Sequence, residues 1–123
     1  MTPNEYQQLA LRTENTPATI DGAQVMRLLH GAIGLCTEAG ELQDMLKKHL
    51  FYGAPLDLVN VVEEIGDLLW YAAIALDAAG SSMDDAMRIN ISKLQVRYPS
   101  KFTAAAAMTR DLAAERAVLE GAK

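Results

Sequence analysis

The sequence predicts an all-α fold, an antiparallel bundle of about four to five helices that is completed by oligomerisation. Half of the 123 residues are hydrophobic, but only 6% are aromatic. This composition, with heavy use of alanine, favours closely packed helices over a sheet, which needs more β-branched and aromatic residues. The length suits one domain and is too short for two independent cores. We therefore expect a single helical domain over residues 1–123, with its core over about 21–102 and an alanine-rich C-terminal segment over 103–123.

The first two helices are marked by residues that begin and end helices. Thr2-Pro3-Asn4-Glu5 has the pattern of a capping box, with a hydroxyl cap, proline in the first turn and a glutamate three residues after the cap. We expect this helix to end near Thr13, before the Asn15-Thr16-Pro17 break. A second helix is predicted from about Asp21 to about His49, because a turn sequence with Gly53 and Pro55 follows it.

The third and fourth helices have similarly marked ends. The third is predicted over about 57–79, and Gly80 suits the left-handed turn that ends it. Ser82 caps the fourth, with Asp85 three residues on, and this helix ends at Tyr98 because a proline follows. Residues 100–123 form either a fifth helix or an arm. We expect the second, third and fourth helices to pack as one antiparallel bundle with short connections.

The second half of the third helix is apolar on all sides. At 100° per residue, one face carries eight apolar residues, which are Leu58, Val61, Val62, Ile65, Leu68, Leu69, Ala72 and Leu76. From residue 68 onward the opposite face is apolar as well, and it carries Trp70, Tyr71, Ile74 and Ala78. A helix that is apolar all round must be covered all round. We therefore predict a homo-oligomer, a dimer or a tetramer; the alternative is that the C-terminal segment folds back over this helix.

Charge and composition disfavour several classes of function. Eleven basic and sixteen acidic residues give a net charge of −5, which weighs against non-specific binding to nucleic acid or to an anionic membrane. The longest apolar run, residues 68–76, has about half of the ~20 residues that a membrane span needs. The single cysteine, Cys36, cannot form an internal disulfide, and the first residues lack the features of a signal peptide. We expect a cytoplasmic protein that binds neither nucleic acid nor membrane.

Two pairs of carboxylates form the strongest candidate for a functional site. Glu38 and Glu41 lie three residues apart in the second helix, and Glu64 and Asp67 do so in the third. The two members of each pair therefore project from one side of their helix, where like charges repel. A hard divalent cation between two such pairs would neutralise them, because it takes oxygen ligands.

A glycine inside each pair supports this interpretation. Gly40 and Gly66 have low helix propensity, and we expect them to let a neighbouring backbone or a ligand approach closely. The alternative is that the acids form an ordinary solvated surface, since charged pairs at this spacing are common on exposed helices.

Polar residues on two helices complete a predicted substrate site. In the second helix one stripe resembles a pocket wall more than a core seam, and it consists of His30, Gly34, Glu38, Glu41, Met45 and Lys48. Within it, His30 is a candidate to contact a base or sugar, and Lys48 to contact a phosphate. In the fourth helix, Asn90, Lys93 and Arg97 share a face that suits a polyphosphate bridged by metal. For both sets, solvated side chains are the alternative.

Together these motifs resemble a known family. Glu-x-x-Glu at Glu38 is followed about two dozen residues later by Glu-x-x-Asp, and then by Asn-x-x-Lys-Leu-x-x-Arg-Tyr-Pro over residues 90–99. From His30 to Phe102 this order is similar to that of the MazG-like all-α nucleoside triphosphate pyrophosphohydrolases, and the Arg-Tyr-Pro ending resembles their dCTP-pyrophosphatase-like branch. That branch usually has a tryptophan near the base, but residues 45–49 lack one, so the resemblance implies no base preference.

The resemblance implies a bundle of at least two subunits that binds Mg²⁺ through Glu38, Glu41, Glu64 and Asp67. It implies that Lys93 and Arg97 contact the phosphates of a ribo- or deoxyribonucleoside triphosphate and that Asn90 contributes its amide. The expected reaction is cleavage between the α- and β-phosphates, which gives a nucleoside monophosphate and pyrophosphate. Glu41 is our candidate to orient or deprotonate the attacking water.

Two other functions stay open. A helical interaction or nucleotide-binding protein without catalysis would use its apolar third helix for partners, and Mg²⁺ would not affect its stability. A related hydrolase of dUTP or of a phosphoribosyl nucleotide would differ in its products. A ferritin-like di-iron bundle is disfavoured, because the sequence contains no Glu-x-x-His.

Overall fold

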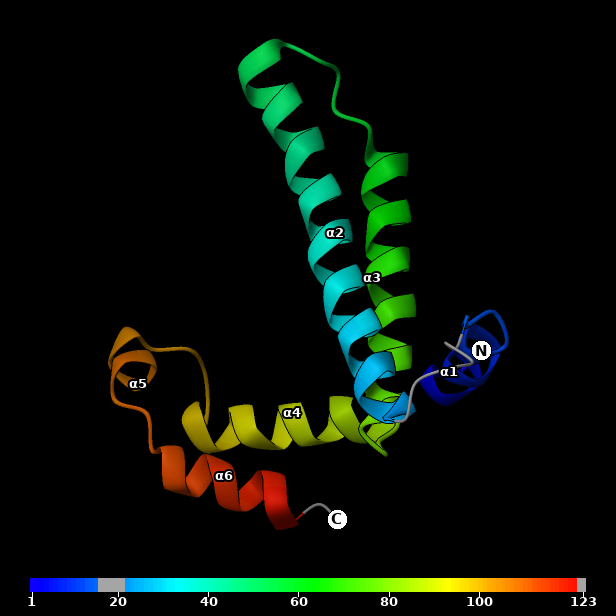
Figure 1. Ribbon diagram of the computed structural model, residues 1–123. Coiled ribbons are helices and arrows are strands. Elements are labelled where there is room, and N and C mark those ends of the chain that lie inside the picture. Colours follow the sequence, from blue (N-terminus) through cyan, green and yellow to red (C-terminus); the bar gives the residue numbers. More distant parts are fainter. Residues whose placement is uncertain (16–21, 122–123) are drawn as a thin grey trace. The chain divides into compact units, whose positions relative to one another are not determined.

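The computed structural model describes residues 1–15 and 22–121, and every regular element in these ranges is a helix (Figure 1). The all-α class predicted from the sequence is therefore confirmed. By their internal packing the described residues form two compact units, residues 1–82 and the chain from Met83 onward. None of the described helices is both long enough and apolar enough to span a bilayer.

The first unit is built on a helical hairpin. α2 (Ala23–Tyr52) and α3 (Leu58–Ala78) lie side by side in antiparallel directions, joined by the short segment 53–57 (Figure 1). α1 (Pro3–Leu11) packs against α3. The buried Gln7 of α1 stabilises this packing, because its Nε2 donates to the carbonyl oxygens of Ala73 at 3.3 Å and Ser81 at 3.2 Å.

The start of α1 and both ends of α3 follow the residues that predict them, whereas α1 ends at Leu11, two residues before the predicted Thr13. Thr2 Oγ1 accepts from the backbone N–H of Glu5 at 3.2 Å, and a Glu5 carboxylate oxygen accepts from that of Thr2 at 2.6 Å, so the capping box is confirmed. Asp57 caps α3 by accepting from two backbone N–H groups of its first turn. Gly80, with a φ of 71°, takes the left-handed conformation expected after this helix.

α2 ends later than the sequence predicts. Its last residue is Tyr52 rather than His49, because the left-handed residue that ends it is Gly53, with a φ of 72°. His49 lies in the last turn, where its Nδ1 is 2.8 Å from the carbonyl oxygen of Ala54. The predicted start of this helix, Asp21, falls outside the described residues.

α2 and α3 pack tightly against each other at two glycines in the N-terminal half of α2. A Cβ added to Gly34 would lie 2.1 Å from Cδ1 of Tyr71, and one added to Gly31 would lie 2.9 Å from Cβ of Ala75. The sequence predicted that Gly40 and Gly66 would let a neighbouring backbone or a ligand approach closely; no backbone of the described residues does so, and the approach of a ligand stays a prediction. A Cβ at either would meet no atom of the described residues within 4 Å, because these glycines do not face the packed seam.

α3 buries one face and leaves another exposed. Ala73, Ile74 and Ala78 are almost completely buried. Four large side chains from the predicted apolar face are between 44% and 70% exposed, and they are Leu58, Val62, Ile65 and Leu69. Within the first unit, α1 and α2 therefore do not cover α3 on all sides.

In the second unit α4 (Met83–Arg97) packs against α6 (Leu112–Gly121), with the short α5 (Ala104–Met108) between them in sequence. α4 ends one residue before the predicted Tyr98. The alanine-rich segment forms two helices rather than one, because the hydroxyl of Thr109 donates to the last turn of α5 and Asp111 then accepts from the backbone N–H of Ala114 in α6. Packing of the fourth helix on the second and third stays a prediction.

Candidate metal and nucleotide site

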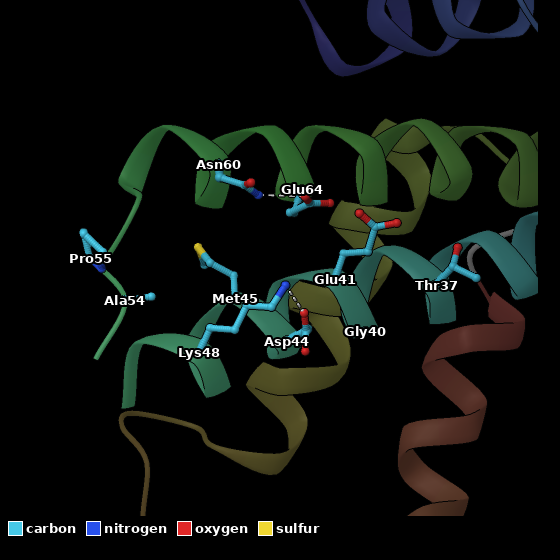
Figure 2. Close-up of a pocket in the computed structure, with 10 residues that line it drawn as sticks. All are labelled: Thr37, Gly40, Glu41, Asp44, Met45, Lys48, Ala54, Pro55, Asn60 and Glu64. Carbon is cyan, nitrogen blue, oxygen red and sulfur yellow. Dashed lines mark hydrogen bonds and ion pairs between the residues drawn. The ribbon is translucent and has the colours of Figure 1, made fainter. Parts of the chain in front are cut away.

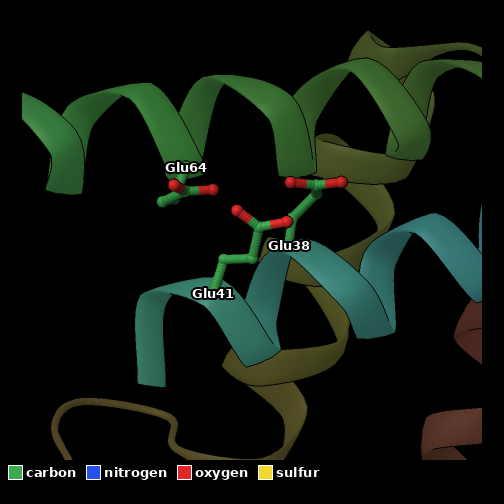
Figure 3. Close-up of side chains that lie close together, drawn as sticks. All are labelled: Glu38, Glu41 and Glu64. Carbon is green, nitrogen blue, oxygen red and sulfur yellow. The ribbon is translucent and has the colours of Figure 1, made fainter. Parts of the chain in front are cut away.

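Three glutamates from the two helices of the hairpin converge. Glu38 and Glu41 project from α2 and Glu64 from α3, and each offers a carboxylate oxygen within 4.8 Å of the others (Figure 3). The spacing of three residues places the first two on one side of α2, and the antiparallel hairpin brings the third to face them. Glu64 is only 7% exposed, whereas Glu41 is open to solvent.

The cluster has no positive partner among the described residues of its own unit. Among the described residues of the first unit, no lysine or arginine lies within ion-pair distance of these three carboxylates. The pKa of Glu38 is raised above its ordinary value, first by desolvation and then by the charges of Glu41, Asp67 and Glu64, against the lowering effect of a hydrogen bond from Thr37. Burial raises a carboxyl pKa, and like charges held together without a counterion raise it further.

The arrangement suits a hard divalent cation. All the donors are carboxylate oxygens, which Mg²⁺ and Ca²⁺ prefer, and they come from two rigid helices. A cation between them would replace mutual repulsion with attraction. The residues present therefore fit a metal site of the kind that the two acidic pairs predict.

A pocket of about 620 Å³ adjoins the cluster, a volume typical of small-molecule sites (Figure 2). Glu41 and Glu64 line it, and Ala54 and Pro55 lie at its other end (Figure 2). Lys48 lies along the α2 side, where its Nζ is 2.6 Å from a carboxylate oxygen of Asp44. The pocket thus joins an anionic end to an apolar end and has one cation along its wall.

Two polar residues that sequence reasoning missed hold the acidic side chains. Asn60 lines the pocket, and its Nδ2 donates to Oε1 of Glu64 at 2.7 Å (Figure 2). Thr37 Oγ1 lies 3.2 Å from Oε1 of Glu38. The signal that could have revealed Asn60 is its position four residues before Glu64, the spacing at which helical side chains meet.

The other residues predicted on the hairpin have mixed outcomes. Asp67 is exposed and lies outside the group of three, although its charge contributes to the raised pKa of Glu38. Lys48 lines the pocket as the stripe on α2 predicts.

The N-terminal end of that stripe, with Gly34 and His30, does not line this pocket. Gly34 is buried beneath the ring of Tyr71. His30 makes edge contacts with Trp70 and Tyr71, at centroid distances of 6.2 and 5.6 Å, and is not among the lining residues. These residues lie along the aromatic side of the α2–α3 packing, so a role of His30 toward the substrate stays a prediction.

The predicted phosphate-binding residues all belong to α4. Asn90 is exposed and Lys93 is half-buried. The guanidinium of Arg97 donates to both carboxylate oxygens of Glu115 in α6, at 2.8 and 2.6 Å, and Arg110 donates to the same carboxylate. Glu115 is 3% exposed. Sequence reasoning missed it, because nothing in the alanine-rich segment marks one glutamate among several as buried.

Comparisons with known proteins bear on the whole arrangement. Searches of curated proteins and of solved structures gave no significant match. The model of one protein family, described as the MazG nucleotide pyrophosphohydrolase domain, matches residues 31–102. This match spans more than half of the chain and includes both acidic pairs and the predicted phosphate-binding residues of α4. It does not separate branches of the family, so the dCTP-pyrophosphatase-like branch stays a prediction. The chain belongs to the MazG nucleotide pyrophosphohydrolase family.

Proposed function

We propose that this protein is a Mg²⁺-dependent nucleoside triphosphate pyrophosphohydrolase, which cleaves between the α- and β-phosphates to give a nucleoside monophosphate and pyrophosphate. The observation that carries the proposal is the convergence of Glu38, Glu41 and Glu64 beside a pocket, in a chain of a nucleotide pyrophosphohydrolase family. The size of the pocket and its apolar end suit a nucleotide whose phosphates lie at the carboxylates and whose base lies toward Ala54 and Pro55.

In this proposal the three clustered glutamates hold the metal, and Asp67 is a fourth ligand. Mg²⁺ supplies neutralisation of the triphosphate and of the pyrophosphate that leaves. The proximity of the three carboxylates supports the assignment, since a hard cation accepts several oxygen ligands. The charge of Asp67, which acts on Glu38, supports its inclusion.

We assign the orientation or deprotonation of the attacking water to Glu41. Glu38 has a hydrogen bond from Thr37 and Glu64 one from Asn60. Among the described residues, Glu41 has no side-chain partner of this kind, and it is exposed to solvent at the pocket. A carboxylate with unengaged oxygens is the one best able to accept a proton from water.

Cationic residues bind the phosphates in this proposal. Lys48 is favoured by its place in the pocket, and Lys93 and Arg97 by their place in the matched motif. Asn90 contributes an amide donor, and His30 is retained as a contact to the base or sugar. Glu115 accepts hydrogen bonds only from Nε and Nη2 of Arg97, so other N–H donors of this guanidinium remain available to a phosphate.

We also propose that the protein is a homo-oligomer, a dimer or a tetramer. The exposed apolar residues of α3 support this, because a partner that covers a side chain 44–70% exposed contributes roughly half of the 1.5–3 kcal/mol for burying it fully. Residues around Val62 would lie at the centre of such an interface.

The test is a panel of ribo- and deoxyribonucleoside triphosphates, dUTP included, and phosphoribosyl nucleotides, incubated with Mg²⁺ and the protein. Chromatography of the products separates monophosphate plus pyrophosphate from diphosphate plus phosphate. We expect the first pair, and we expect Glu64→Gln to abolish it. Glu63→Gln, which removes a neighbouring carboxylate outside the cluster, is the matched control and should keep full turnover. Absence of turnover with every substrate would refute the enzymatic proposal and favour a binding role.

A further inference from the structure

Asn60 stands out among the polar residues of the pocket, because its side chain reaches a carboxylate of the cluster. Its Nδ2 donates to Oε1 of Glu64 at 2.7 Å, and both residues line the pocket (Figure 2). Its backbone is fixed as well, since the N–H of Asn60 donates to the capping carboxylate of Asp57 at 3.2 Å. The amide therefore projects from a secured first turn of α3.

This hydrogen bond restricts the conformations of the Glu64 side chain. A glutamate side chain has three rotatable torsions, and ordering it costs conformational entropy that a metal ion must otherwise overcome. A hydrogen bond to Oε1 orients the carboxylate and leaves Oε2 open to a ligand. It also gives the nearly buried Glu64 a partner, which offsets part of its desolvation.

The amide of Asn60 carries no charge, and this matters for metal binding as much as its hydrogen bond does. A lysine or arginine at this position would pair with Glu64 and compete with a cation for the same carboxylate. Asparagine donates a hydrogen bond but leaves the negative charge of the cluster intact. Groups that orient metal ligands through such bonds raise metal affinity without touching the ion.

We propose that Asn60 is a positioning residue of the metal site, which holds the Glu64 carboxylate in the orientation that a divalent cation requires. The inference rests on the proposed function, in which the clustered glutamates bind Mg²⁺.

The test compares variants by Mg²⁺ titration of the melting temperature, without nucleotide and at constant ionic strength. Asn60→Leu removes the donor, and leucine has the higher helix propensity, so the helix itself is retained. We expect the Mg²⁺ concentration at half-maximal stabilisation to rise about tenfold, the lower end of the range for lost outer-shell partners. Gln43→Leu makes the same change at an exposed site on α2 outside the pocket, and it should leave this concentration unchanged.

A second variant separates positioning from structural support. Asn60→Gln keeps an amide donor four residues before Glu64, and it should recover part of the lost Mg²⁺ affinity. In turnover assays, Asn60→Leu should need a higher Mg²⁺ concentration than wild type for half-maximal rate, and Asn60→Gln should recover part of this difference.

The outcomes distinguish this inference from the proposed function. If wild type is stabilised by Mg²⁺ and Asn60→Leu has the same half-point, the positioning role is refuted. Equal losses in Asn60→Leu and Asn60→Gln would refute it too, since the donor would then be irrelevant. If wild type itself does not respond to Mg²⁺, it is the proposed metal dependence that fails.

Discussion

Glu64→Gln is expected to stabilise the metal-free protein while removing its response to Mg²⁺. The carboxylates of Glu38, Glu41 and Glu64 lie within 4.8 Å of one another, and two unit charges at that distance repel by about 1 kcal/mol in the dielectric of water. Glutamine keeps the shape of Glu64 and its acceptor for Asn60 but removes the charge. Relief from two repulsive pairs amounts to about 2 kcal/mol before screening by salt.

The assay is a melting curve at low ionic strength, with and without Mg²⁺. For a chain of this length, 2 kcal/mol raises the melting temperature by roughly 6–10 °C. Wild type should gain about 2.7 kcal/mol when Mg²⁺ is at 100 times its Kd, whereas Glu64→Gln should gain little. Glu63→Gln removes a neighbouring charge outside the cluster and should behave as wild type. A lower metal-free melting temperature in Glu64→Gln, or an equal response of both proteins to Mg²⁺, would refute the reasoning.

Four further predictions follow from the same contacts. Glu41→Gln should abolish turnover while the protein melts as a folded domain; substantial remaining turnover would remove Glu41 from the mechanism. Val62→Asp should shift sedimentation toward the monomer, and a monomeric wild type would contradict this. Hydrogen bonds from its two arginine partners hold the pKa of Glu115 below its ordinary 4.5. The ionised carboxylate therefore stabilises the folded protein fully above that pH, and this contribution is lost as the pH falls below it. The melting temperature of wild type should accordingly fall more steeply below about pH 4.5 than that of Glu115→Gln. Gly34→Ala should cost about 1–3 kcal/mol in urea unfolding, because the added Cβ overpacks the seam.

Features that depend on local sequence could be predicted well. The capping box at Thr2 and the left-handed Gly80 are set by residues within one turn of each other, so their pattern is visible without tertiary structure. The end of α2 was placed about one turn early, because the turn sequence with Gly53 marks that a helix stops but does not show that the helix continues right up to the left-handed glycine. Helix ends are thus predictable to within a turn wherever a cap is present.

The cluster of carboxylates could be predicted only in part, for a different reason. The spacing of three residues determines that Glu38 and Glu41 share a side of α2, but which α3 carboxylate faces them depends on the register of the hairpin. That register brings Glu64 into the group and leaves Asp67 outside it. Glu115 shows the same limit, because a buried acid that binds two arginines has no local signature.

The packing glycines explain how the hairpin brings the carboxylates together. Gly34 of α2 packs against Tyr71 of α3. Glu41 lies seven residues after Gly34, and Glu64 lies seven residues before Tyr71, so the antiparallel helices bring these two glutamates face to face as well. Seven residues are about two turns, or roughly 10 Å, so both contacts lie on the same sides of α2 and α3. The close approach at Gly34 therefore sets the separation of the helices at the carboxylates. Gly34→Ala should for this reason weaken Mg²⁺ binding as well as stability, whereas Gly40→Ala, where an added Cβ meets nothing within 4 Å, should change neither adversely.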